Sequence, residues 1–309
     1  MEPWHLLGIE PLGRGEIEGI LRGARALREL LRGPTKKRSD LRGKTVINLF
    51  FENSTRTRVS FEMAAKILGA DAINWSAAGS SQAKGETFLD TIRTLEAMRP
   101  DVLVIRHAAS GAAELAARHV RCSVVNAGDG AHEHPTQALL DALTLQDHLG
   151  SLEGRRIAIV GDIAHSRVAR STSLCLRRLG ASVVLCGPRT MLPAAPWEGV
   201  EMVSDLREAL READAIIALR IQLERISECL FSSAREYARY FGLSRRTLAW
   251  AKEGAFVLHP GPMNRGVEIE PEIADGGRSL VLHQVESGVA VRMAVLLRAA
   301  GKLEESIHG

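Results

Sequence analysis

The side chains most able to do chemistry form a run of hydroxyl and guanidinium groups shortly behind an apolar segment. The run reads S-T-R-T-R and begins at Ser54, after the segment that ends at Phe51. At the start of a helix, free backbone N–H groups and the helix dipole attract an anion. Arg56 adds a guanidinium fork that can hold phosphate oxygens. A Ser-Thr pair alone is equally typical of a plain helix cap, but two arginines in the same run favour a phosphate site.

Further polar side chains follow the next apolar segments. Arg106 comes directly after residues 102–105, and the sequence H-P-T-Q at 134–137 follows residues 123–126 and a Gly-rich loop. Open α/β sheets bind ligands at the carboxyl ends of their strands. A lone histidine such as His134 is more often a structural capping group. Three strand ends that all carry polar donors nevertheless predict a pocket for a small anion with a carbonyl and an amide.

Two arginines follow strand-like segments in the second half of the chain. Arg167 comes after residues 156–160 and opens an amphipathic stretch, and Arg220 follows residues 215–219. Either arginine alone could be a solvated surface group. Together they suit a dicarboxylate, because each guanidinium fork can take one carboxylate.

Two sheets are needed to hold these side chains. Amphipathic stretches, such as 55–68, 88–98, 135–149, 167–179 and 206–213, alternate with short apolar runs rich in Val and Ile. This alternation predicts parallel sheets with right-handed crossovers. We therefore predict an α/β fold with two similar-sized domains, each a parallel sheet flanked by helices, and an active site in the cleft between them. The predicted strands are 45–50, 71–75, 102–105 and 123–126, then 156–160, 182–186, 215–219 and 256–258.

The domain break is expected at the sequence G-S-L-E-G, residues 150–154. It separates a first domain of residues 1–149 from a second domain of residues 150–282. The last apolar helix, at about 283–300, is expected to pack back on the first domain.

Composition excludes several classes of protein. The 309 residues are 45% hydrophobic and 25% charged, and the net charge of +3 is spread without a basic block, which argues against nucleic-acid binding. No apolar run is long enough for a membrane span, and the first residues do not resemble a secretory signal. The four cysteines lie far apart, so neither a zinc site nor a disulfide framework is indicated. A cytoplasmic location is expected.

The S-T-R-T-R run, the R-H pair at 106–107 and H-P-T-Q resemble the carbamoyl-phosphate motifs of the carbamoyltransferase family. From about residue 45 to 300, the chain is similar to the catalytic chains of the aspartate-specific members. This resemblance implies that Thr57, Arg106 and His134 surround the substrate carbonyl oxygen and that Gln137 takes the amide. It implies that the phosphate is held by Ser54, Thr55, Arg56 and Thr57.

The resemblance also assigns the acceptor site. It implies that Arg167 and Arg220 bind the carboxylates of aspartate, with Gln222 assisting. In the turn H-P-G-P at 259–262, the backbone carbonyls of Gly261 and Pro262 would face the substrate amino groups. Ornithine-specific members typically carry a Cys-containing H-C-L-P turn there, so this turn favours aspartate.

The composition of the Gly/Ser-rich loop at 76–87, taken alone, predicts only a flexible connection. By resemblance, Ser80 and Lys84 from this loop enter the active site of a neighbouring subunit, although Ser81 is an alternative to Ser80. A shared site implies a homotrimer. A larger assembly with a regulatory chain or with dihydroorotase is left open.

The activity implied is transfer of a carbamoyl group from carbamoyl phosphate to L-aspartate, a step of pyrimidine biosynthesis. Both reacting groups come with the substrates, so no metal or other cofactor is expected. Arg56, Thr57, Arg106 and His134 are the predicted catalytic residues, with His134 polarising the carbonyl rather than acting as a base. The alternatives are carbamoylation of ornithine or a diamine, and a protein that binds carbamoyl phosphate without turnover.

Overall fold

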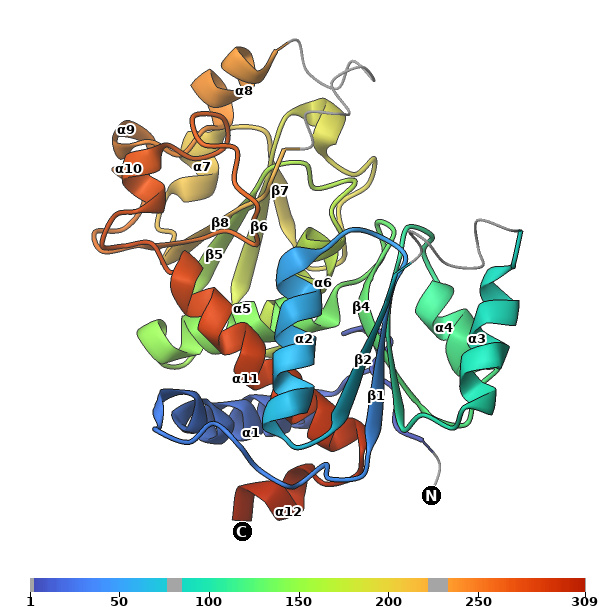
Figure 1. Cartoon of the computed structure of the whole chain (residues 1–309). Helices are drawn as coiled ribbons and strands as arrows, with labels where there is room; N and C mark the ends of the chain where they lie inside the picture. Colours follow the sequence, from blue (N-terminus) through green and yellow to red (C-terminus); the bar gives the residue numbers. More distant parts are fainter. Residues whose placement is uncertain (1–2, 77–84, 222–232, 309) are drawn as a thin grey trace. The chain divides into compact units, whose positions relative to one another are not determined.

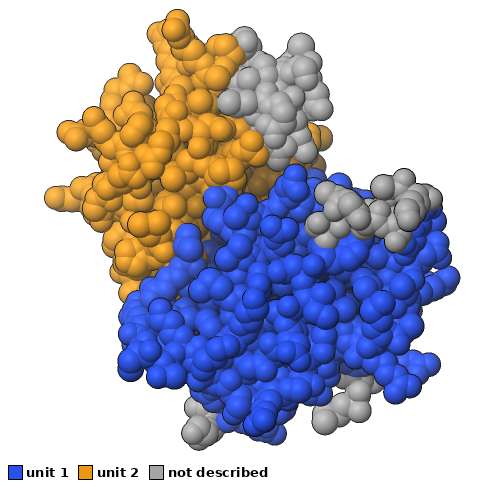
Figure 2. Space-filling view, viewed as in Figure 1, with its two compact units in different colours: residues 1–140, 285–309 blue, residues 141–284 orange. Residues whose placement is uncertain are grey.

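The computed structural model describes residues 3–76, 85–221 and 233–308 (Figure 1). The chain divides into two compact units, one of residues 1–140 with 285–309 and one of residues 141–284 (Figure 2). The first unit holds a four-stranded sheet and the second a five-stranded sheet, and all pairs of neighbouring strands are parallel. The predicted α/β class with two parallel sheets is therefore confirmed.

The sheet of the first unit has the order β2-β1-β3-β4. Its strands are β1 (Thr45–Phe50), β2 (Asp71–Ser76), β3 (Val102–His107) and β4 (Ser123–Asp129). The inner strands are almost fully buried, as expected when helices cover both faces of a parallel sheet. From β1 the chain reaches β2 on one side, and β3 then pairs with the other side of β1. The strand order thus reverses between β1 and β3, and such a switch point is where open α/β sheets bind ligands.

Helices from both ends of the chain complete this unit. They are α1 (Arg14–Arg32), α2 (Thr55–Ile67), α3 (Phe88–Ala97), α4 (Ala112–Ala117), the start of α5 (Pro135–Leu149), most of α11 (Val281–Ala299) and α12 (Leu303–His308). Figure 1 shows α11 beside α1 and α2. The Ser123 hydroxyl donates to the Ala299 carbonyl at 2.7 Å, and Arg32 pairs with Glu286 at 2.9 Å. These contacts hold α11 to the first unit.

The sheet of the second unit has the order β7-β6-β5-β8-β9. The strands are β5 (Arg156–Val160), β6 (Ser182–Cys186), β7 (Glu201–Val203), β8 (Ala215–Ala218) and β9 (Phe256–Leu258). The strand order reverses between β5 and β8, which gives this sheet its own switch point. The helices are α6 (Arg167–Arg178), α7 (Leu206–Leu210), α8 (Ala234–Phe241), α9 (Arg245–Leu248) and α10 (Pro271–Ala274), with a single 3₁₀ turn at Arg189–Met191.

Strand β7 and helices α1, α4, α8, α9, α10 and α12 are not among the predicted elements. Of the helices that the structure describes, none is both long and apolar enough to cross a membrane.

Candidate active site

The S-T-R-T-R run lies at the switch point of the first sheet. Helix α2 begins at Thr55, directly behind β1, with Ser54 as its N-cap residue in extended conformation. The Ser54 side chain makes no capping hydrogen bond, and the first turn of α2 contains no acidic residue. Thr57 is buried, whereas Thr55 and Arg56 are exposed. The first turn therefore offers backbone N–H groups, hydroxyls and a guanidinium without a competing carboxylate in that turn.

Arg106 and His134 lie together at the ends of the neighbouring strands. A guanidinium nitrogen of Arg106, Nη1, is 3.4 Å from His134 Nε2 and donates to the Ala127 carbonyl at 3.2 Å. On its other side, Arg106 Nε is 3.3 Å from a carboxylate oxygen of Glu52. The His134 side chain is only 5% exposed. The structure thus brings two of the predicted carbonyl-binding residues into one pair.

A buried carboxylate network positions the loop ahead of His134. Asp129 Oδ1 accepts from the Asn126 amide at 2.8 Å and from the Glu133 N–H at 3.1 Å, and its Oδ2 accepts from the Gly111 N–H at 2.6 Å. Glu133, which is fully buried, accepts the N–H group of Ile9 at 3.1 Å. Sequence reasoning missed Asp129 and Glu133. The signal present was two acidic residues inside the Gly-rich loop that leads to His134.

Gln137 lies in the first turn of α5 and is 8% exposed. Its neighbour Thr136 is fully buried, and the Thr136 hydroxyl accepts from Arg292 of α11 at 3.5 Å. Arg292 also lies over the ring of Phe61 in α2, 5.2 Å from the ring centroid. A buried arginine therefore links the two helices whose first turns carry the motif residues.

His107, the second residue of the R-H pair, packs in an aromatic group instead of facing the same way as Arg106. Its ring centroid lies 5.0 Å from that of Phe51 and 5.1 Å from that of Phe88. Trp75 contacts the other side of Phe51, at 4.7 Å. The His107 Nδ1 accepts from the Ala109 N–H at 2.8 Å, and burial lowers the pKa of the ring. This group supports the ends of β1, β2 and β3.

In the second unit, Arg167 and Arg220 follow the two strands of the switch point, β5 and β8. Arg167 is the first residue of α6, and the N-cap Ser166 accepts from the Ala169 N–H at 3.1 Å. Gly161, just behind β5, has a φ of +147°, and a Cβ there would lie 2.7 Å from Leu219 Cβ. Glycine thus lets the ends of β5 and β8 approach closely. Arg220 follows directly after Leu219, and Arg167 follows the loop that begins at Gly161.

The turn H-P-G-P follows β9 in the same unit. Gly261 has a φ of +63°, and its N–H donates to His259 Nδ1 at 2.7 Å. His259 Nε2 donates in turn to Glu268 at 3.2 Å, and both side chains are buried. The His259 N–H donates to the Gln284 side chain at 2.9 Å. The predicted residues Ser80, Lys84 and Gln222 lie outside the described residues.

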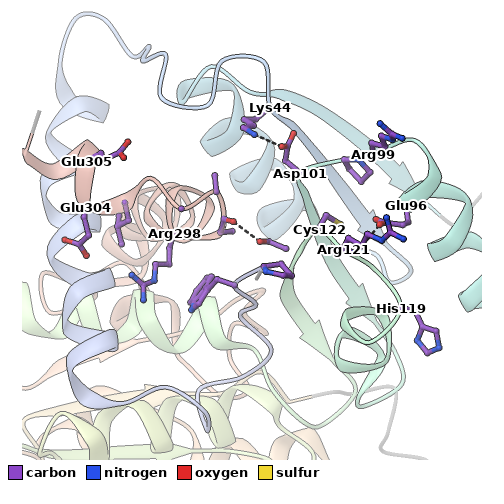
Figure 3. Close-up of a pocket in the computed structure, with 18 of the residues that line it drawn as sticks. Lys44, Glu96, Arg99, Asp101, His119, Arg121, Cys122, Arg298, Glu304 and Glu305 are labelled. Atoms are coloured by element: carbon purple, nitrogen blue, oxygen red, sulfur yellow. Dashed lines mark hydrogen bonds and ion pairs between the residues drawn. The ribbon is translucent and has the colours of Figure 1, made fainter. Parts of the chain in front are cut away.

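A cavity lies elsewhere, at the amino ends of the first unit's strands (Figure 3). Its volume is about 1260 Å³. Both cationic and anionic side chains line it, and Figure 3 shows Lys44 paired with Asp101. Ligand sites of parallel sheets lie at the opposite ends of the strands, so we place the candidate site at the motif residues and not at this cavity.

Comparison with protein families identifies both halves of the chain. Residues 4–147 match the family model of the carbamoyl-phosphate-binding domain of aspartate/ornithine carbamoyltransferases. Residues 153–299 match the model of the aspartate/ornithine-binding domain of the same enzymes. The chain belongs to the aspartate/ornithine carbamoyltransferase family.

Curated members of the family are similar over nearly the whole chain. The aspartate carbamoyltransferase catalytic subunit of Anaeromyxobacter sp. (strain K) is 58% identical over 299 residues, which are 96% of each chain. The subunit of the same name from Methylorubrum extorquens (strain PA1) is 58% identical over 293 residues, which are 94% of this chain and 93% of that protein.

Solved structures with this fold include enzymes named for aspartate and enzymes named for ornithine. Aspartate transcarbamoylase from Trypanosoma cruzi, in complex with N-(phosphonacetyl)-L-aspartic acid, superposes with a TM-score of 0.86 at 31% identity, over 96% of this chain and 95% of that one. Ornithine carbamoyltransferase from Pyrococcus furiosus also gives 0.86, at 28% identity, over 97% and 98% of the two chains. Because the two scores are equal, the backbone fold does not distinguish the acceptors.

Proposed function

We propose that this chain transfers the carbamoyl group of carbamoyl phosphate to the amino group of L-aspartate, giving N-carbamoyl-L-aspartate and phosphate. The reaction belongs to pyrimidine biosynthesis, and we place it in the cytoplasm. The observation that carries the choice of acceptor is the pair of arginines, Arg167 and Arg220, behind the two switch-point strands. Two guanidinium forks suit the two carboxylates of aspartate. The aspartate carbamoyltransferase relatives at 58% identity support the same choice.

The first unit holds carbamoyl phosphate. The first turn of α2 binds the phosphate group through backbone N–H groups, the hydroxyls of Ser54, Thr55 and Thr57, and the Arg56 guanidinium. The absence of an acidic residue from this turn supports the assignment. Gln137 accepts from the carbamoyl amide, and the backbone carbonyls of Gly261 and Pro262 accept from the substrate amino groups.

The chemistry is addition and elimination at the carbamoyl carbon. The aspartate amine attacks that carbon, and a tetrahedral intermediate with an oxyanion forms. Thr57, Arg106 and His134 donate to the oxyanion, and the 3.4 Å contact between the Arg106 and His134 side chains supports their common task. The bond between the carbamoyl carbon and the phosphate oxygen then breaks, and the phosphate takes up the amine proton. Loss of one such donor typically reduces the rate by about 10²–10³.

We propose a homotrimer in which Ser80 and Lys84 of one subunit enter the active site of the next. Strand β2 is an edge strand and leads directly to residues 77–84. Three apolar side chains on β2 and the adjacent helix α2 are 42–50% exposed: Val59, Met63 and Ile73. An exposed apolar face next to an open sheet edge supports association of identical chains.

Turnover with purified protein tests the acceptor. Carbamoyl phosphate is supplied with either L-aspartate or L-ornithine, and both the released phosphate and the carbamoylated product are measured. We expect carbamoylaspartate formation that requires aspartate. Ornithine turnover would keep the assignment of the first unit and refute that of the second. Binding of carbamoyl phosphate with no turnover of either amine would favour the non-catalytic alternative.

Mixing of inactive variants tests the shared site. Lys84→Ala and Arg56→Ala chains are each expected to be nearly inactive alone. In a mixed trimer some sites combine Arg56 of a Lys84→Ala chain with Lys84 of a neighbouring Arg56→Ala chain, so part of the activity returns. Mass spectrometry of the intact assembly verifies the mixing. Verified mixed trimers without any recovery would contradict a site built from two subunits.

A further inference from the structure

Asn264 holds the chain at the point where strand β8 has just ended. The ladder between β5 and β8 ends at Ala218, and one more bond runs from the Leu219 N–H to the Val160 carbonyl at 2.8 Å. Arg220 and Ile221 lie beyond this ladder. The Asn264 side-chain amide donates to the Ile221 carbonyl at 2.7 Å. The backbone directly after Arg220 is therefore fixed by a side chain and not by sheet pairing.

The backbone of Asn264 is itself held by the turn that begins at His259. The Asn264 N–H donates to Glu268 Oε1 at 2.5 Å, and His259 Nε2 donates to the same oxygen at 3.2 Å. The other ring nitrogen of His259 accepts from the Gly261 N–H at 2.7 Å. Glu268 is 1% exposed. The buried Glu268 carboxylate thus joins His259 to Asn264. Gly261, which lies between these two residues, is held by its own bond to His259.

The segment from His259 to Glu268 is also bonded to the core of the second unit. The Glu268 carbonyl accepts from the Leu243 N–H at 3.0 Å, and the Asn264 carbonyl accepts from the Val267 N–H at 3.0 Å. The side chains of Ile221 and Val267 lie in one apolar cluster with Met191 and Tyr237. The bond between Asn264 and Ile221 therefore joins two segments whose side chains already pack together.

We propose that Asn264 is a positioning residue for the acceptor substrate, because it fixes Arg220 relative to the turn at residues 259–262. The inference rests on the proposed function, in which Arg220 binds a carboxylate of aspartate and the turn faces its amino group. Arg220 and the turn would contact opposite parts of one aspartate molecule. The distance between Arg220 and the turn must therefore match the distance between the carboxylate and the amino group of aspartate. Misplacement of a binding group by about 1 Å can reduce a rate about 10²-fold.

Asn264→Ala separates this role from the integrity of the turn. The substitution removes the donor to Ile221 but keeps the backbone N–H that binds Glu268. We expect the KM for aspartate to rise at least about ten-fold, because Arg220 is no longer fixed, while the Kd of carbamoyl phosphate changes less than about two-fold. Amide hydrogen exchange should quicken in peptides that cover residues 219–221. Asn264→Gln retains an amide donor and should recover part of the affinity for aspartate.

Arg265→Gln is the matched control. Arg265 is the next residue along the chain, and its exposed guanidinium pairs with Asp275 at 2.6 Å. We expect wild-type kinetics from this variant. A KM for aspartate within two-fold of wild type in Asn264→Ala would overturn the inference. Equal loss of affinity for aspartate and carbamoyl phosphate, together with a lower Tm, would overturn it too, because it would indicate a merely structural role. The wild-type assay separates the two failures, since a wild type that does not use aspartate contradicts the proposed function first.

Discussion

At the scale of single residues, the pair formed by His134 and Arg106 is the most specific feature of the candidate site. Arg106 lies 3.4 Å from His134 in the loop before α5, 3.2 Å from the Ala127 carbonyl in β4, and 3.3 Å from the Glu52 carboxylate. The network around Asp129 and Glu133 fixes that loop. His134 is therefore held where a carbonyl oxygen bound next to Arg106 would also be within its reach.

We predict that His134→Ala lowers kcat by about 10²–10³ with saturating substrates, because one donor to the oxyanion is lost. The Kd of carbamoyl phosphate should change far less, since the first turn of α2 still binds the phosphate. Steady-state kinetics and calorimetric titration measure the two quantities. His119→Ala, which alters an exposed histidine just after the end of α4, is the control. A kcat close to wild type in His134→Ala would remove this residue from the chemistry.

His107 gives a prediction about pH. Its burial among Phe51 and Phe88 lowers its pKa from the ordinary value of 6.5. The unfolded chain therefore binds a proton at a higher pH than the folded chain does. Stability from this group is complete above about pH 6.5 and is lost as the pH falls through the folded pKa.

We therefore expect His107→Phe, which keeps an aromatic ring in the group, to lose less stability than wild type between pH 7.5 and pH 5.5. Urea unfolding at both pH values, followed by circular dichroism, measures the difference. His119→Phe serves as the exposed counterpart. Parallel losses in wild type and His107→Phe would mean that this ring does not set the acid sensitivity.

At the scale of elements, both units use the same device at the amino ends of their central strands. Asp101, just ahead of β3, accepts from the Thr45 N–H at 2.8 Å and from Lys44 at 2.8 Å. Asp214, just ahead of β8, accepts from the Arg156 N–H at 2.9 Å and from Arg155 at 3.2 Å. In each unit one carboxylate joins the two strands that border the switch point.

Asp214→Asn tests this device in the second unit. Lys252 also donates to Asp214, at 3.1 Å, and the side chain is 6% exposed. Burial by itself would raise the pKa of Asp214, but the bonds from the Arg156 N–H and from Lys252 outweigh it and lower the pKa below the ordinary 3.8. We expect a loss of about 1.5–3 kcal/mol in the free energy of unfolding near pH 7, the usual range for hydrogen bonds to a charged group.

The pH dependence follows from the same shift. Because the folded pKa is lowered, the stabilisation by Asp214 is present above about pH 3.8 and is lost as the pH falls through the folded value. The difference between wild type and Asp214→Asn should therefore shrink in acid. Asp275→Asn is the matched control, since Asp275 also pairs with an arginine but is 65% exposed, and water screens exposed ion pairs. Equal effects of the two substitutions would show that burial of Asp214 adds nothing.

Most of the strands that the sequence predicts have buried apolar runs, although β2 is predicted to within one residue while its Ile73 is 50% exposed. The boundaries of β1, β5, β6 and β9 agree to the residue with prediction. Strand β4 continues to Asp129, three residues past the predicted end, because Asp129 still pairs with His107 of β3 beyond a shift in register. Strand β7 was missed because it has three residues, begins with the exposed Glu201, and exists only through its pairing with β6.

In the candidate site, too, some features can be predicted from the sequence and others cannot. The S-T-R-T-R run and H-P-T-Q can be found in the sequence because neighbouring residues act together at one helix start. The bond from Asn264 to Ile221 joins residues 43 positions apart, and the bond from the Ile9 N–H to Glu133 spans 124 positions. No local pattern encodes such contacts. Local sequence patterns could therefore suggest the candidate binding residues but not the residues that position them.

At the scale of the whole molecule, the proposed activity needs more than one chain, because Lys84 would act in a neighbour's site. The exposed face of α2 and β2 is the surface that we assign to this association. Met63 is 45% exposed on α2, one turn from Val59, and Ile73 is 50% exposed on the edge strand. Helix α4 offers a comparison within the same unit, since Leu115 is 39% exposed there and lies on no proposed interface.

We predict that Met63→Glu shifts the protein towards single chains, because a carboxylate in an apolar interface is costly to bury. Activity at low protein concentration should fall at least about ten-fold and should return as the concentration is raised, since association follows mass action. Light scattering after size-exclusion chromatography gives the mass, and assays over a dilution series give the activity. Leu115→Glu should keep both mass and activity, because its charge stays in water. An assembled, fully active Met63→Glu protein would place the interface elsewhere, whereas single chains with full activity at every dilution would contradict a site completed by Lys84 of a neighbour.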